Sequence, residues 1–192
     1  MRFLVAHNRL SPLKPGAIVG FATKTRLMTM TQMDDPLLKA ADNLVSLAKT
    51  NADAMLTPLL GEYSSLGRAP AIKHWVQIVT IASVFIATTR LDAREKEVMD
   101  KVYDRFTQWD KNAMPALEDC ASFFAKHFDE HIQAGHEPRS IASDGIGLWV
   151  IWNVFERPPQ TDEEVKLVRV IGAMITNTFF DYWGDQTSRQ WD

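Results

Sequence analysis

The strongest constraint on the fold is an apolar run in the first half of the chain. Residues 72–90, IKHWVQIVTIASVFIATTR, are apolar on nearly every side of a helix between Trp75 and Ala87. A helix of this composition lies either in the centre of a protein or in a membrane. The uninterrupted run is 13 residues long and includes Thr80 and Ser83, whereas a bilayer requires about 20 apolar residues. We therefore expect a helix buried in the centre of a core.

Helical periodicity extends over most of the remaining chain. Apolar residues recur three and four positions apart, and no alternating apolar runs are separated by the Asn-Gly or Asp-Gly pairs that favour hairpins. We predict an all-α fold in which a single domain, residues 34–184, forms an orthogonal or bundle-like array of about six helices. The expected helices are three central ones at 72–90, 145–156 and 162–183, and three amphipathic ones that cover them at 35–66, 92–111 and 115–134.

Local signals refine the first and last of these helices. Pro58 lies inside the first helix and is expected to kink or break it, because proline lacks a backbone N–H. Thr161 and Glu164 are spaced as a capping box, which predicts the start of the last helix. Gly172 leaves a gap on that helix and indicates the close approach of a neighbour.

The two ends of the chain differ in composition from the domain. Residues 1–33 carry five basic side chains and no acid, and we expect a basic, flexible extension, or sequence upstream of a later start at Met28, Met30 or Met33. An organellar transit peptide is the alternative, because such peptides are also Arg-bearing and poor in acids. The apolar runs are too short for a secretory signal. Residues 185–192 are expected to form a polar tail.

Charge and cysteine content argue against several functional classes. The net charge of the whole chain is −3, and because residues 1–33 are basic, the domain itself is clearly acidic and would repel a phosphate backbone. We expect no nucleic-acid partner and no membrane span. The single cysteine, Cys120, excludes an intrachain disulfide and a cysteine-rich zinc module. We expect a cytoplasmic location, where thiols stay reduced, with organellar import as the alternative.

Three of the five histidines lie within residues 127–137, HFDEHIQAGHE. His127 and His131 are four positions apart, so both imidazoles project from one side of a helix, as in helical zinc sites. A zinc centre requires three or four ligands, and the others would have to come from His74, His136, Glu137 or a distant acid. The catalytic pattern H-E-x-x-H is absent. Metal binding at His127 and His131 is therefore the alternative, and an unoccupied pair at a helix edge is the preferred interpretation.

No other catalytic motif is present. The chain contains no phosphate-binding G-x-x-x-x-G-K-[ST] loop, no G-x-S-x-G elbow and no recurring pair of carboxylate–histidine helices. Cys120 lies among apolar residues and is expected to be an inert buried thiol. We expect no cofactor, and we consider a non-enzymatic function better supported than an enzymatic one.

Aromatic residues are the remaining feature with functional meaning. The segment 145–156 is almost wholly apolar, and the chain ends in FFDYWGDQTSRQWD. Many of these apolar side chains can fill a core, but a group of them that remained exposed would mark a binding surface. Trp183 and Trp191 are the candidate interface residues. The leading hypothesis is a helical protein that acts by binding a protein, with self-association the simplest case. The alternative is a protein that binds a metal or small molecule at the histidine edge or in a cavity between apolar helices.

Overall fold

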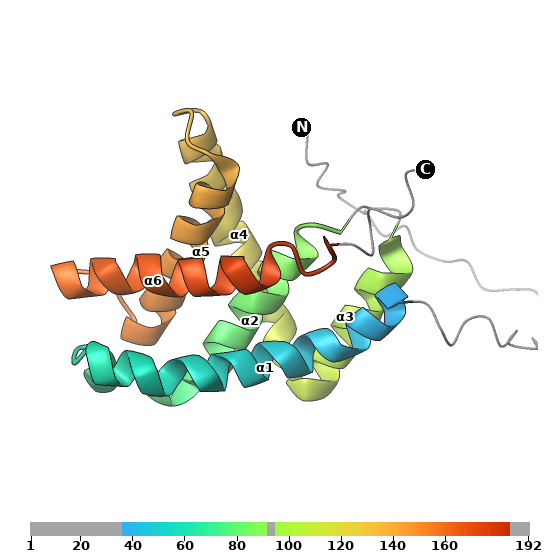
Figure 1. Ribbon diagram of the computed structural model, residues 1–192, viewed down its shortest axis with the longest axis horizontal. Coiled ribbons are helices and arrows are strands. Elements are labelled where there is room, and N and C mark those ends of the chain that lie inside the picture. The colour runs from blue at the N-terminus through green and yellow to red at the C-terminus, as the bar shows by residue number, and fades with distance from the viewer. Residues whose placement is uncertain (1–35, 92–94, 185–192) are drawn as a thin grey trace, which may run out of the picture. The chain divides into compact units, whose positions relative to one another are not determined.

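The computed structural model describes residues 36–91 and 95–184 (Figure 1). Within this part of the chain all regular structure is helical and no strand occurs, which confirms the predicted all-α class. The predicted N-terminal extension and the C-terminal tail with Trp191 lie outside the described residues. The elements are α1 (Pro36–Glu62), the short 3₁₀ turns η2 (Leu66–Arg68) and η3 (Ile72–His74), α2 (Trp75–Thr88), α3 (Lys96–Trp109), α4 (Ala113–Ile132), α5 (Pro138–Phe155) and α6 (Asp162–Phe179).

Helix α2 lies at the centre of the domain. Every residue from Ile78 to Thr88 is buried, and α2 packs against α1, α4, α5 and α6. The hydroxyl of Ser83 donates to the carbonyl of Val79 at 2.8 Å, so this polar group is satisfied inside its own helix. The interpretation of the apolar run as a core helix is therefore confirmed. Among the described residues, every helix is too short or too polar to span a bilayer.

Helices α5 and α6 approach each other through glycine. A methyl group added to Gly172 would collide with the main-chain carbonyl of Ser143, and one added to Gly147 would collide with the carbonyl of Val168. The two backbones are thus in direct contact at two levels, which larger residues would prevent. This confirms the close approach predicted for Gly172.

The helix boundaries differ from the predicted ones, most of all in α1, α5 and α6. Helix α1 continues through Pro58 to Glu62, so this proline does not break the helix. Helix α5 begins at Pro138 instead of residue 145, because Glu137 caps it with its carboxylate, which accepts from two backbone N–H groups of the first turn. Helix α6 ends at Phe179 rather than residue 183, and turns follow it to Gly184.

Helices α4 and α5 form an antiparallel pair, joined by residues 133–137, that runs across the direction of α1 and α6 in Figure 1. The joined end of the pair extends beyond α6 in the same view. Its burial pattern agrees with this placement, because no residue from Ala121 to Ser140 is buried. One end of the pair therefore belongs to the core and the other end stands largely in solvent.

Candidate functional site

The predicted pair His127 and His131 lies on the outer half of α4. The two imidazole rings are stacked, with centroids 4.1 Å apart and planes 29° apart, and His136 adds a third ring edge-on to His131 at 5.7 Å. The Nδ1–H of His131 donates to the carbonyl of His127 at 2.8 Å. Within the described residues, no group of three or more His, Cys, Asp or Glu side chains is arranged to hold a metal ion. The structure thus brings the histidines together as stacked rings.

His127 is held tightly against α5. Its Cδ2 lies 2.7 Å from the position that a Cβ of Gly145 would take, so the ring fits there because Gly145 has no side chain. Its Nε2 is buried and has no hydrogen-bond partner among the described residues. Burial of the ring, and next the proximity of His131, lower the pKa of His127 below its ordinary value, while Asp144 and Glu130 oppose this shift.

Trp183, one of the two expected interface residues, is a core residue in this chain. Its side chain is 2% exposed, and the indole N–H donates to the carbonyl of Ala87 at 2.7 Å. That carbonyl belongs to the last turn of α2, where carbonyls lack partners within the helix. Trp183 therefore fixes the chain after α6 to the end of α2, and it offers no surface to a partner. Trp191 lies outside the described residues.

The outer half of α4 carries an apolar surface that is not covered by the core. Leu117 is buried, but Phe124 and Phe128 are only half-buried and Ile132 is 38% exposed. These residues recur at three- and four-residue spacing, so they lie on one side of the helix together with Ala121. We call Ala121, Phe124, Phe128 and Ile132 the α4 stripe. The exposed part of this stripe is the candidate functional surface.

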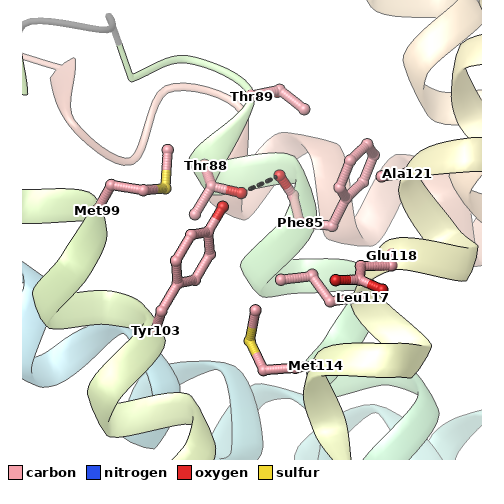
Figure 2. A pocket seen from close by; sticks show the side chains of 9 residues that line it. All are labelled: Phe85, Thr88, Thr89, Met99, Tyr103, Met114, Leu117, Glu118 and Ala121. Carbon is pink, nitrogen blue, oxygen red and sulfur yellow. Dashed lines mark hydrogen bonds between the residues drawn. The ribbon is translucent and has the colours of Figure 1, made fainter. Parts of the chain in front are cut away.

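The α4 stripe leads into an apolar pocket at its inner end, between the end of α2, α3 and α4 (Figure 2). The pocket has a volume of about 360 Å³. Figure 2 shows Tyr103 and Met114 facing the space from α3 and α4, with Phe85 on the far side. Phe85 contacts Phe124 edge-to-face at 5.1 Å between ring centroids, which links the pocket to the stripe. The lining residues are Phe85, Thr88, Thr89, Met99, Tyr103, Met114, Leu117, Glu118 and Ala121.

A second aromatic contact lies on the α5 side of α4. Trp152 is 43% exposed and meets Phe123 edge-to-face with ring centroids 6.0 Å apart. Nearby, the indole N–H of Trp149 donates to the carboxylate of Asp119 at 3.0 Å. Trp149 is thus fixed inside the pair, while Trp152 presents much of its ring to solvent. Sequence analysis did not single out Trp152, because exposed and buried tryptophans share the same apolar segment.

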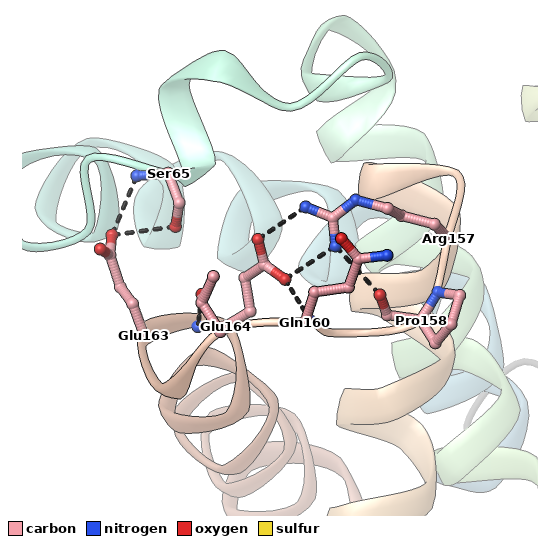
Figure 3. A network of polar contacts seen from close by, with 7 residues as sticks. Ser65, Arg157, Pro158, Gln160, Glu163 and Glu164 are labelled. Atoms are coloured by element: carbon pink, nitrogen blue, oxygen red, sulfur yellow. Dashed lines mark hydrogen bonds and ion pairs between the residues drawn. The ribbon is translucent and has the colours of Figure 1, made fainter.

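A polar network at the loop between α5 and α6 was also not predicted (Figure 3). Arg157 donates to both carboxylate oxygens of Glu164, each at 2.8 Å, and Ser65 donates to Glu163 through its N–H and its hydroxyl, both at 2.9 Å. The Thr161 hydroxyl accepts from the N–H of Glu164, as the capping box predicted. Both oxygens of Glu164 are paired with donors, and Glu163 joins the start of α6 to Ser65, so we interpret the network as structural.

Cys120 is fully buried, and burial raises the pKa of its thiol well above the ordinary value. A thiol with a raised pKa holds little thiolate and is a poor nucleophile.

Comparison of the chain with protein-family models, curated proteins and solved structures found no match. The function must therefore be argued from the surfaces and the pocket.

Proposed function

We propose that this chain is a non-enzymatic helical protein that acts by binding a protein through the α4 stripe, and that the partner is a second copy of the chain. The observation that carries the proposal is the loss of burial along α4. The apolar face of this helix continues to Ile132, yet no residue of α4 after Cys120 is buried. An apolar face that runs past the core is typical of a binding surface.

The size pattern along α4 favours a second copy. In an antiparallel contact of two α4 helices centred between Phe124 and Ala125, Phe128 of one copy lies over Ala121 of the other. Ile132 then lies over Leu117, at the wall of the pocket. Large residues of the outer half thus meet a small residue and a hollow of the inner half, and a two-fold axis repeats the match. Burial of one such large side chain contributes roughly 1.5–3 kcal/mol.

Light scattering on the purified chain at tens of micromolar tests this proposal. We expect a dimer for the wild type and a monomer for Ile132→Lys, because lysine places a charge against the apolar wall of the partner's pocket. Leu60→Lys on α1 is the matched control, since Leu60 is 40% exposed against 38% for Ile132, and it should remain dimeric. A wild type that is monomeric at this concentration, or a loss of dimer in both variants, would contradict the proposal.

Ligand binding in the pocket is the second candidate function, and the volume of about 360 Å³ favours it because small-molecule sites occupy roughly 300–1,000 Å³. The apolar lining suits a neutral apolar molecule. Nile red fluorescence is a direct probe. Dye binding should survive in Ile132→Lys and disappear in Ala121→Trp, in which the indole fills the pocket. Equal fluorescence in the two variants would exclude this pocket as the dye site.

A further inference from the structure

The histidine cluster of α4 has a geometry that neither self-association nor ligand binding uses. At the joined end of the α4–α5 pair, the rings of His127 and His131 stack and His136 lies edge-on to His131. His127 lies beside the stripe and packs against Gly145 of α5. We propose that this cluster is a proton-sensitive contact which releases the outer end of α4 from α5 in mildly acidic solution.

The first support is the fit of His127 against Gly145. The ring packs where a side chain of Gly145 would lie, so it is in direct contact with the backbone of α5. Its buried Nε2 has no acceptor among the described residues. In a neutral imidazole protonated at Nδ1, the lone pair of Nε2 simply remains without a donor. A protonated ring would carry an N–H without an acceptor, together with a charge, which costs more.

The second support is the stacking of the rings. With the ring centroids 4.1 Å apart, the neighbouring His131 opposes a positive charge on His127. The Nδ1–H of His131 already donates to the carbonyl of His127, which holds this ring over its neighbour. Repulsion is therefore relieved most readily by movement of the helix end, rather than by rotation of the ring.

Charged groups around His127 act in both directions. Asp144 on α5 and Glu130 on α4 favour its protonated form, while His131 and burial favour the neutral form. The net result is a lowered pKa for His127. Protonation therefore weakens the contact of His127 with α5 as the pH falls. Histidine is the side chain that titrates between about pH 5 and 8, which sets the range in which the contact responds.

The third support is the weak anchoring of this region. No residue from Ala121 to Ser140 is buried, so the joined end of the pair has little core packing to resist separation. Regions with few buried contacts open at low free-energy cost without global unfolding. Release is thus confined to the outer end of α4 and the start of α5, while α2 stays in place.

Hydrogen exchange followed by mass spectrometry at pH 7.5 and pH 5.5 tests the inference, with rates divided by those of the unstructured peptide at each pH. We expect protection in residues 121–145 of the wild type to fall by roughly three- to tenfold on acidification, while 75–88 changes little. His127→Phe keeps a ring and removes the titration, so its protection should not fall. His74→Phe, at an exposed histidine outside the cluster, is the matched control and should behave as the wild type.

A second variant keeps the inference testable if His127→Phe does not fold. His131→Phe removes the other stacked ring and should reduce the fall in protection, with folding checked by circular dichroism. The same measurement in Ile132→Lys should retain the full pH effect, which separates this inference from self-association. Equal falls in protection for the wild type, His127→Phe and His131→Phe, or no fall in the wild type, would overturn the proposal.

Discussion

Arg157 and Glu164 form an ion pair with two parallel hydrogen bonds of 2.8 Å across the loop between α5 and α6 (Figure 3). The carboxylate also accepts from the N–H of Gln160 at 2.6 Å, and its side chain is 3% exposed. The hydrogen bonds from Arg157, together with those from the backbone, lower the pKa of Glu164 to about 2. The pair therefore fixes the path of the chain as it turns from one helix to the next.

The first prediction concerns acid. Because the pKa of Glu164 is about 2 in the folded protein and 4.5 ordinarily, its contribution to the free energy of unfolding is complete above about pH 4.5 and is lost as the pH falls toward 2. Glu164→Gln should lower the free energy of unfolding by about 1–3 kcal/mol at pH 7. Urea titrations at pH 7, 4 and 3 should show a smaller loss on acidification in the variant.

Glu118→Gln is the control for this experiment. It removes the same charge, but Glu118 forms no ion pair among the described residues, so the wild-type dependence on pH should remain. Equal slopes of stability against pH in the wild type and Glu164→Gln would show that the pair does not contribute through ionisation.

The second prediction concerns the contact of α5 with α6. Gly172→Ala should destabilise the fold by about 1–3 kcal/mol, since the new methyl group meets main-chain atoms that cannot rotate away. Gly61→Ala on α1 is the matched control, because no atom lies within 4 Å of its added Cβ, and alanine should leave stability unchanged or raise it by up to about 1 kcal/mol. Thermal melts of both variants check this. Similar melting temperatures for Gly172→Ala and Gly61→Ala would mean that α5 and α6 can move apart without loss of stability.

The third prediction distinguishes core from surface tryptophans. Trp183→Ala should cost about 3–5 kcal/mol, because it empties a buried site and removes the indole hydrogen bond to the carbonyl of Ala87. Trp152→Ala should cost much less, since 43% of this residue is exposed. Urea unfolding followed by circular dichroism gives both values. A mild effect of Trp183→Ala would restore this residue as a candidate for binding.

The fourth prediction concerns Pro58, which α1 tolerates inside its last turns. Pro58 is exposed and cannot donate a hydrogen bond to the preceding turn. Pro58→Ala should therefore raise the free energy of unfolding by about 1 kcal/mol. The comparison is with Thr57→Ala, the exposed neighbouring position, which should change stability little. A destabilised Pro58→Ala protein would show that the ring makes packing contacts that matter.

The class of fold and the central position of α2 follow from the pattern of apolar residues along the chain. A helix that is apolar on all sides, but too short for a bilayer, has only the centre of a helical array available to it. The sequence also predicts the capping role of Thr161 and the close helix contact at Gly172, because both depend on local backbone geometry. The start of α5 was missed, although Glu137 followed by Pro138 is a helix-start signal of this kind.

Which apolar residues are covered depends on how the helices pack in three dimensions. Trp183 and Trp152 both lie in apolar segments of the sequence. Trp183 is buried against the end of α2, whereas Trp152 is 43% exposed. Phe128 and Ile132 continue the apolar face of Leu117, but the joined end of α4 and α5 extends past the helices that would cover it. Periodicity shows which side of a helix is apolar, whereas burial depends on where neighbouring helices end, and that is set by packing between distant parts of the chain.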